Sequence, residues 1–137
     1  MEYIIGVVLG FVVGAIGTIM GFDREKSFYA TVMIVIAAYY VLFAAMGGTG
    51  QVIVAEIIAG SVFLILALYG SRKSLWIIVG AIVGHGLFDS VHHLLIENPG
   101  VPRWWPGFCG TIDVVIGVWL SVRLKMLGKD AVPAASR

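Results

Sequence analysis

The sequence predicts an all-α membrane protein, a single domain built as a bundle of five transmembrane helices. Three observations predict this class: 60% of the residues are hydrophobic, only 12% are charged, and the mean hydropathy is +1.00. A soluble domain of 137 residues with this composition would expose far too much apolar surface. The connections between the apolar runs are short, so no room is left for a second domain.

Five apolar runs are long enough, or nearly so, to cross about 30 Å of hydrocarbon at about 1.5 Å per helical residue. We expect spans near residues 3–20, 28–46, 52–69, 75–96 and 111–127. The breaks between them read DREKS, GGTGQ, GSRKS and ENPGVPRWWPG, and each is rich in charge, glycine or proline. A four-span arrangement with the last segment lying on the membrane surface is the main alternative.

The basic residues predict the orientation of the bundle. With five spans, Arg103 alone lies on one side. On the other side lie Arg24, Lys26, Arg72, Lys73, Arg123, Lys125, Lys129 and Arg137. Because basic residues favour the cytoplasmic side, the amino terminus is expected outside and the carboxy terminus inside the cell. The amino end carries no positive stretch before its apolar run, so the first span is expected to be retained.

Composition also bounds the partners and the compartment. The net charge of +1 and the lack of a basic run interleaved with aromatic residues exclude nucleic acid as a partner. The single cysteine, Cys109, excludes a disulfide framework within the chain. We expect a multi-pass protein of the cell membrane, most simply a bacterial inner membrane, in contact with membrane lipid. The tail after Lys129 is expected to be disordered.

The first span carries glycines at nearly regular spacing, at Gly6, Gly10, Gly14, Gly17 and Gly21. On an ideal helix they occupy an arc of about 80°, which forms a smooth groove that another helix can approach closely. The groove fits either a homo-oligomer interface through the first helix or tight packing within one subunit. Gly80 and Gly84 repeat the spacing on the fourth span, so a contact between the first and fourth spans is one expected use.

Ionisable residues gather in the predicted outer half of three spans. His85, Asp89, His92 and His93 fall within an arc of about 100° on the fourth span, while Glu56 and Asp113 lie near the outer ends of the third and fifth spans. Because isolated charges in hydrocarbon are unfavourable, we expect these groups to share one polar pocket that opens outward. The structural alternatives are a Glu56 that reaches the interface and an Asp113 that favours the helix amino end, with Thr111 as its cap.

Three chemistries fit such a pocket. Neutral imidazole and carboxylate suit a divalent metal such as zinc, iron or manganese. The candidate ligands are His85, Asp89, His92, His93, Glu56 and Asp113. The same groups can form a proton or ion relay without a metal, or a purely structural hydrogen-bond network. Tyr39 or Tyr40 of the second span is placed to donate to the cluster.

The connection ENPGVPRWWPGFC combines helix-ending prolines with aromatic residues. Pro99, Pro102 and Pro106 are expected to interrupt helix, while Trp104 and Trp105 suit the headgroup level of a bilayer. The segment is either an interfacial anchor or a lid over the histidine face. In the second reading, Arg103 meets an anionic group, and Cys109 is either a small buried residue or a thiolate ligand.

The segments FYATVMIVIAAYYVLFA, HGLFDSVHH and NPGVPRWWPGFC resemble a family of small, uncharacterised bacterial integral membrane proteins. The likeness covers nearly the whole chain and implies a membrane location without a known activity. DSVHH is also similar to the HxxHH box of membrane desaturases and hydroxylases, with Asp89 in place of the first histidine. Those enzymes need many more histidines than the three present here.

These observations favour a membrane protein that binds a divalent metal in a transport or binding role. No nucleophile with an oriented base is visible, because Ser90 lies on a different helix face from His85 and His92. Catalytic residues are therefore not assigned. A lipid-facing metalloenzyme of hydrolase or oxidase type remains open, as does a non-catalytic structural subunit of a larger membrane complex.

Overall fold

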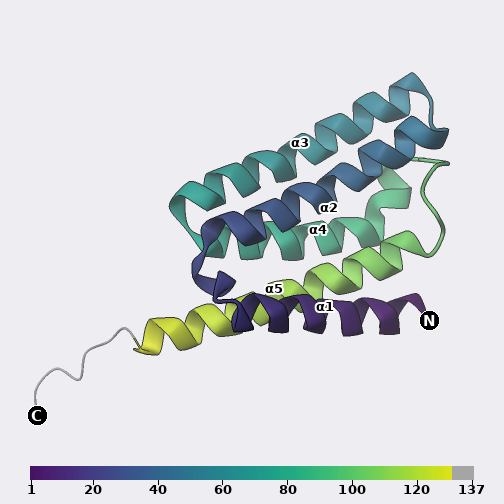
Figure 1. The fold of residues 1–137 in the computed structure, drawn as a ribbon. Coiled ribbons are helices and arrows are strands. Elements are labelled where there is room, and N and C mark those ends of the chain that lie inside the picture. The colour runs from purple at the N-terminus through teal and green to yellow at the C-terminus, as the bar shows by residue number, and fades with distance from the viewer. Residues whose placement is uncertain (131–137) are drawn as a thin grey trace, which may run out of the picture.

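The computed structural model describes the backbone of residues 1–130 and the side chains of residues 1–128. The elements, in chain order, are α1 (Glu2–Ile19), the short 3-10 helix η1 (Phe22–Arg24), α2 (Lys26–Gly47), α3 (Gly50–Lys73), α4 (Leu75–Leu95) and α5 (Trp105–Asp130) (Figure 1). All five α-helices are long and apolar enough to cross a membrane, which confirms the predicted all-helical class. Residues 131–137, which include Arg137 and the tail expected to be disordered, lie outside the described residues.

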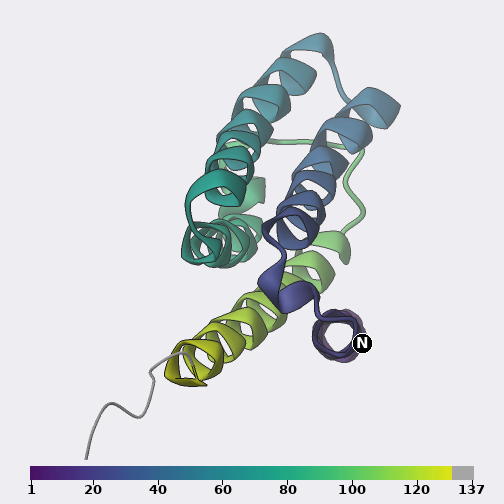
Figure 2. The ribbon, with the colours of Figure 1, turned by 60° about the vertical axis from the view of Figure 1, so that its left-hand side comes forward.

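Helix α4 lies at the centre of the bundle. It packs against α3, α5 and α2, while α1 packs chiefly along α5 at the edge of the molecule. Figures 1 and 2 show α2 and α3 as a hairpin on one side of α4, and α1 and α5 side by side on the other. The last segment is therefore part of the bundle along α4 and α1, unlike the alternative in which it lies apart on the surface.

Local signals in the sequence account for the helix ends. The Thr49 side chain caps α3 by accepting a hydrogen bond from the Val52 amide, and Ser74 caps α4 by accepting from the Trp76 amide. Between α1 and η1, Gly21 has a φ of 77°, a left-handed conformation that residues with a side chain rarely adopt. Gly21 thus reverses the chain after α1. Its predicted role in helix packing is wrong, because no atom beyond its two chain neighbours lies within 4 Å of a Cβ added at Gly21.

The start of α5 differs from the prediction. The helix begins at Trp105 rather than near residue 111, because Pro106 lies in its first turn, where a proline disrupts no hydrogen bond within the helix. Thr111 is therefore not a cap. It lies inside the helix and its hydroxyl donates to the Gly107 carbonyl at 2.6 Å. The longer helix places Cys109 and Asp113 one turn apart on the same face.

The glycine groove of α1 is filled by α5 within the subunit. A Cβ added at Gly6, Gly10 or Gly14 would lie less than 3 Å from Phe108, Val115 or Trp119 respectively. The expected contact between the first and fourth spans is wrong, because nothing lies within 4 Å of a Cβ at Gly80 or Gly84. Unlike Gly6, Gly10 and Gly14, which face α5, Gly17 of the same helix faces the Tyr29 hydroxyl of α2. An oligomer formed through α1 would have to use the helix's other, exposed face.

One end of the bundle holds the α1–α2 turn, the α3–α4 turn and the carboxy-terminal half of α5, and most basic residues lie there (Figure 1). Arg103, in the α4–α5 connection, lies at the opposite end. At the basic end, Asp23 accepts hydrogen bonds from the Tyr29 hydroxyl and the Arg123 guanidinium, each at 2.8 Å. We call Asp23, Tyr29 and Arg123 the basic-end network. It ties the α1–α2 turn to α5.

Candidate metal centre

Helices α4 and α5 cross with their backbones in close contact at Gly86 and Gly110. A Cβ on Gly86 would lie 2.9 Å from the Gly110 carbonyl oxygen, and a Cβ on Gly110 would lie 3.0 Å from the Gly86 carbonyl oxygen. Such approaches exclude any larger residue without a backbone shift. The crossing therefore brings the residues beside these glycines on the two helices together.

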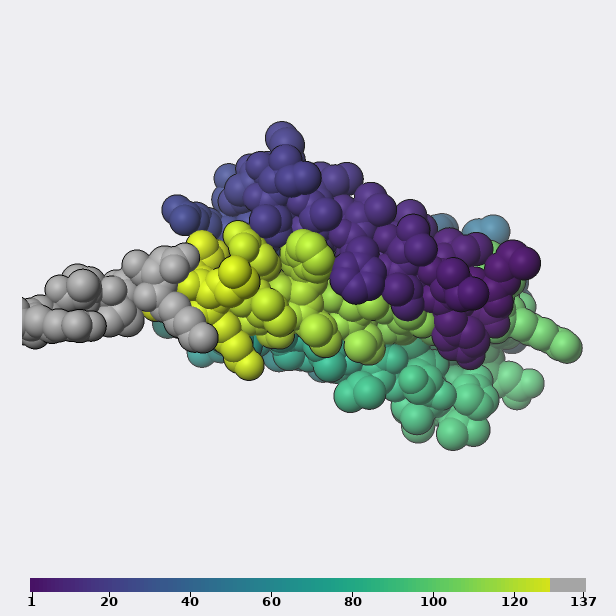
Figure 3. Space-filling model, turned by 90° about the horizontal axis from the view of Figure 1, so that it is seen from below, coloured from purple at the N-terminus to yellow at the C-terminus, as the bar shows by residue number. Residues whose placement is uncertain are grey.

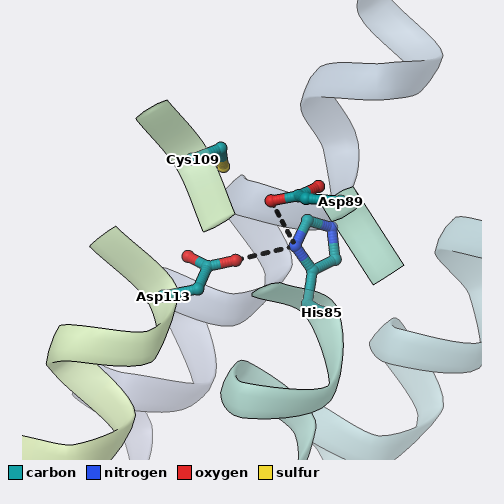
Figure 4. Close-up of side chains that lie close together, drawn as sticks. All are labelled: His85, Asp89, Cys109 and Asp113. Atoms are coloured by element: carbon teal, nitrogen blue, oxygen red, sulfur yellow. Dashed lines mark hydrogen bonds and ion pairs between the residues drawn. The ribbon is translucent and has the colours of Figure 1, made fainter. Parts of the chain in front are cut away.

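Four side chains converge at this crossing, two from each helix. His85 and Asp89 lie one turn apart on α4, and Cys109 and Asp113 lie one turn apart on α5 (Figure 4). One ligand atom of each residue lies within 4.8 Å of the corresponding atoms of the other three, and all four residues are buried. We call these residues the four-residue cluster. The structure thus joins three predicted metal ligands with Cys109, predicted as a lid or pocket residue.

Direct bonds connect part of the cluster. His85 Nδ1 lies 2.8 Å from Asp113 Oδ2 and 3.7 Å from Asp89 Oδ2 (Figure 4). Tyr40 of α2 donates its hydroxyl to Asp89 Oδ1 at 2.6 Å, which makes it the tyrosine of the predicted pair that reaches the cluster. Phe63 of α3 packs its ring against His85 with a centroid distance of 4.7 Å. Each of the four helices α2, α3, α4 and α5 thus helps to hold the cluster in place.

Two carboxylate oxygens of the cluster have no hydrogen-bond partner among the described residues. They are Asp89 Oδ2 and Asp113 Oδ1, both buried. Among the residues whose side chains are described, the two carboxylates have only neutral donors or a histidine beside them, and the lysines and arginines lie toward the two ends of the bundle. Buried carboxylate oxygens without a partner are strongly unfavourable in a low-dielectric interior. A cation bound among the four ligand atoms would offset the charge of both carboxylates.

A second polar group lies next to the cluster, toward the α4–α5 connection. His92 Nε2 lies 2.8 Å from Glu56 Oε1, and the Asn98 side chain donates to the same oxygen at 2.8 Å and to the Tyr40 carbonyl at 3.1 Å. We call Glu56, His92 and Asn98 the anchor group. Glu56 is only 1% exposed, so it does not reach the membrane surface as a structural role at the helix end would require. Glu56 and His92 pair with each other and are not in the four-residue cluster.

Asn98 has no counterpart in the predicted site. Its side chain fixes the α4–α5 connection to α2 and α3, and its Oδ1 accepts from the Gly100 amide at 3.1 Å. The one sequence signal was the Asn-Pro-Gly segment, which is typical of a turn whose asparagine bonds the backbone. The Tyr40 ring stacks on His92 at a centroid distance of 3.9 Å, so the anchor group and the cluster share Tyr40.

His93 differs from the prediction, because its side chain is exposed and lies outside both polar groups. On the α4 helical wheel it lies about 40° beyond Asp89, at the edge of the predicted face. Of the predicted lid residues, Arg103 is exposed and Trp104 is half exposed. Trp105 packs against Tyr39 at 4.9 Å between ring centroids, which places Tyr39 against the start of α5 rather than in the cluster.

A cavity of about 930 Å³ lies beside the cluster, bounded by α1, α4, α5 and the α4–α5 connection. Its lining includes Asp89 and His92 from the two polar groups, and His93, Glu97 and Arg103 from the exposed end of the molecule. We call it the lateral cavity. It is larger than the cavity of about 270 Å³ beside Asp23 and Arg123. Of the six residues expected to share one pocket, Asp89, His92 and His93 line it.

The donor set fits a tetrahedral transition-metal site. Zinc takes histidine nitrogen, cysteine sulfur and carboxylate oxygen at about 2.0–2.3 Å, so its ligand atoms lie about 3.3–3.7 Å apart. The four ligand atoms here lie within 4.8 Å of one another, so small side-chain movements would complete such a shell. Comparison with protein-family models, with curated proteins and with solved structures finds no match to this chain.

Proposed function

We propose that the protein binds one divalent transition-metal ion, most favourably zinc, at His85, Asp89, Cys109 and Asp113. The observation that carries this proposal is the convergence of four buried ligand atoms within 4.8 Å. Two of the residues are carboxylates that each keep one oxygen without a hydrogen-bond partner in the described structure. Burying two acids, a histidine and a thiol together is unfavourable unless a cation or shared protons offset their desolvation.

The ligand types support zinc over the other metals considered. A thiolate favours softer ions, whereas manganese prefers an all-oxygen or oxygen-rich shell, and imidazole suits both zinc and iron. His85, Cys109 and two aspartates combine one nitrogen, one sulfur and two oxygens. This mixture matches the tetrahedral preference of zinc most closely. Iron is the next candidate.

A binding role, or the capture step of a carrier, fits the surroundings of the cluster better than continuous conduction. The lateral cavity approaches Asp89 from the side of the bundle, in the half away from the basic end. Toward the basic end, the bundle is filled by large apolar side chains, among them Ile78, Ile82, Ile116 and Leu120, all at most 1% exposed. By the distribution of basic residues, the cavity end faces outside the cell. A carrier would therefore need a conformational change to release the ion inward.

The second candidate is a lipid-facing metalloenzyme, favoured by the position of the lateral cavity directly beside the cluster. Catalytic zinc keeps one position for water or substrate and has three protein ligands. Asp89, which already accepts from Tyr40, is the ligand most easily displaced from such a shell. The metal-bound water would then face the cavity.

Metal analysis of the detergent-purified protein tests the proposal. We expect about one zinc ion per chain in the wild type, and at least about a tenfold lower content in Asp113→Ala and His85→Ala, since each removes a ligand. His93→Ala is the matched control, because it removes an exposed histidine of the same helix. Helix content by circular dichroism and elution as a single species show that each variant is folded.

Equal metal content in the wild type and in folded cluster variants would contradict the proposal. The same conclusion would follow if His93→Ala lost as much metal as His85→Ala, because the ion would then bind at the surface. For the enzyme candidate, hydrolysis of a lipid ester by zinc-loaded protein, absent in His85→Ala, is the expected result. A role as a structural subunit instead predicts stoichiometric partner proteins that co-purify from native membranes.

A further inference from the structure

The lateral cavity opens through the side of the bundle. Helices α1 and α4 both lie against α5, and α1 packs chiefly along α5 and η1 rather than along α4. Figure 3 looks onto this side of the molecule, where α5 is visible between α1 and α4. The cavity occupies the part of this groove near the amino end of α1, with the α4–α5 connection closing its end. If the five helices cross the bilayer, this opening faces the acyl chains.

The walls and the floor of the cavity differ in character. Val7 of α1, Leu87 of α4 and Val114 of α5 line the walls, and Leu87 and Val114 are 63% and 39% exposed. Asp89 and His92 line the floor and are 0% and 2% exposed. Asp89 is thus a fully buried carboxylate behind the inner end of an apolar passage, with one oxygen that lacks a hydrogen-bond partner in the described structure. A ligand head bonds it once the side chains that cover it move aside.

The charged residues at the cavity floor determine which polar head group a ligand of this cavity can have. At the floor, Asp89 lies close to Asp113 and, through Tyr40 and His92, to Glu56. This surrounding repels an anionic head and favours a group that donates hydrogen bonds. The rim carries both signs, Glu97 and Arg103, and so selects no net charge. The volume of about 930 Å³ lies within the range of about 300–1,000 Å³ typical of small-molecule sites.

We propose that the lateral cavity binds an uncharged amphiphile from the membrane, with a hydroxyl head donating to Asp89 and a hydrocarbon tail between Val7, Leu87 and Val114. A carboxylate offers about four acceptor positions, so Asp89 can bond Tyr40, a metal ion and a ligand hydroxyl together. The proposal does not require a metal in the four-residue cluster. With a metal bound, the amphiphile's head lies beside the ion, which makes it the substrate class of the enzyme candidate.

Photolabelling tests the proposal. The probe is a long-chain primary alcohol with a diazirine in its tail, added to purified protein in detergent after chelation of metal, so that the outcome does not depend on metal binding. Covalent labelling is mapped by peptide mass spectrometry. We expect labels on the cavity segments of α1, α4 and α5, and stronger labelling than by a fatty acid that carries the same tail.

The matched variants are Val114→Trp and Val118→Trp. Val114 lines the cavity, whereas Val118 is one turn further along α5, 53% exposed and outside the cavity lining. Val114→Trp is expected to lower labelling about tenfold, the loss that corresponds to about two methylene groups no longer buried. Val118→Trp should label like the wild type. Both introduce the same side chain at an exposed position of one helix, so a general effect of tryptophan is controlled.

Three results would overturn the proposal. The first is equal labelling of the wild type and Val114→Trp. The second is stronger labelling by the fatty acid than by the alcohol, which would contradict the acidic floor as the head site. The third is a covalent dimer as the main product when Leu87 is replaced by a photoreactive residue, because a second copy of the chain would then fill the groove.

Discussion

The protein buries carboxylates at the basic end of its bundle and between α4 and α5, and the two regions stabilise them in different ways. At the basic end, Asp23 is 2% exposed, and both of its oxygens accept a hydrogen bond, one of them from the permanently charged Arg123. In the four-residue cluster, Asp89 and Asp113 have a histidine, a tyrosine and a cysteine as neighbours. One oxygen of each has no hydrogen-bond partner in the described structure.

This difference separates a structural network from the proposed binding site. In the basic-end network the charge of Asp23 is matched within the chain, so its function is complete when the α1–α2 turn is tied to α5. In the four-residue cluster the acids outnumber any cation that the chain supplies nearby. Carboxylates that no cation of the chain pairs, held between crossing helices, are what a metal site offers before its ion binds. Substitutions in each region test this difference.

The largest expected effect comes from separating the two helices that carry the cluster. Gly110→Ala places a Cβ 3.0 Å from the Gly86 carbonyl oxygen, so α4 and α5 must move apart and the ligand atoms with them. We expect zinc affinity to fall about 100-fold, the upper range for residues that orient metal ligands. Competition with a chelator of known affinity measures the change.

The control for this substitution is Gly84→Ala on α4, where nothing lies within 4 Å of the added Cβ. It should leave the metal affinity unchanged and favour the helix slightly, by at most about 1 kcal/mol. Similar metal loss in both variants would show that the close crossing at Gly86 and Gly110 does not form the site.

Substitution in the basic-end network should affect stability without affecting metal. Asp23→Asn leaves the Arg123 charge, which is 27% exposed, without its partner. We expect the free energy of unfolding to fall by about 2 kcal/mol, less than for a fully buried pair because solvent screens part of the charge. Unfolding in mixed micelles of detergent and dodecyl sulfate gives this value, and the zinc content of the folded variant should equal that of the wild type.

The same network predicts a pH dependence of stability. Burial alone would raise the pKa of Asp23, but hydrogen bonds, the largest from Arg123, outweigh it and hold the pKa below its ordinary value of 3.8. Because the folded-state pKa is the lower one, the stabilisation is present above pH 3.8 and is lost as the pH falls through the folded value. Asp23→Asn should remove this part of the acid sensitivity. An acid unfolding profile of Asp23→Asn equal to that of the wild type would contradict this contribution of Asp23.

A smaller effect is expected from Tyr40→Phe. The substitution removes the hydroxyl that donates to Asp89 at 2.6 Å but keeps the ring that stacks on His92. Loss of one orienting hydrogen bond should weaken zinc binding about tenfold. Tyr39→Phe is the control, since the Tyr39 ring packs against Trp105. Isothermal titration with zinc compares the two variants, and equal affinities would remove Tyr40 from the site.

The smallest effect is expected from Asn98→Ala in the anchor group. It removes two hydrogen bonds that fix the α4–α5 connection to Glu56 and to the Tyr40 carbonyl. We expect a loss of about 1–2 kcal/mol of stability, with faster hydrogen exchange confined to residues 96–104. Zinc content should stay within about twofold of the wild type, because Asn98 does not touch the cluster. Loss of the metal would instead join the anchor group to the site.

The amino-acid sequence predicts the five helices but places the start of the last one too late. Apolar runs predict five spans because hydrocarbon length requires them, whereas Pro106, which is expected to interrupt helix, lies in the first turn of α5. With the start misplaced, Cys109 and Asp113 could not be recognised as neighbours on one helix face. The i, i+4 spacing of these two residues, which repeats that of His85 and Asp89, was the available signal.

The assembly of the site depended on packing that periodicity does not encode. The wheel of α4 correctly placed His85, Asp89 and His92 on one face, but which of them meets which partner is set by neighbouring helices. Glu56 of α3 pairs with His92, and Asp113 of α5 pairs with His85. The glycines of α1 predicted a close contact, but the sequence could not say that α5 is the helix that fills it.

X-ray absorption spectroscopy at the zinc edge identifies the atoms that bind the ion. For zinc-loaded protein we predict a shell of one sulfur at about 2.3 Å and three nitrogen or oxygen atoms at about 2.0–2.1 Å. Cys109→Ser should remove the sulfur contribution. A zinc shell without sulfur in the wild type, or a sulfur contribution that persists in Cys109→Ser, would contradict a metal centre at the crossing of α4 and α5.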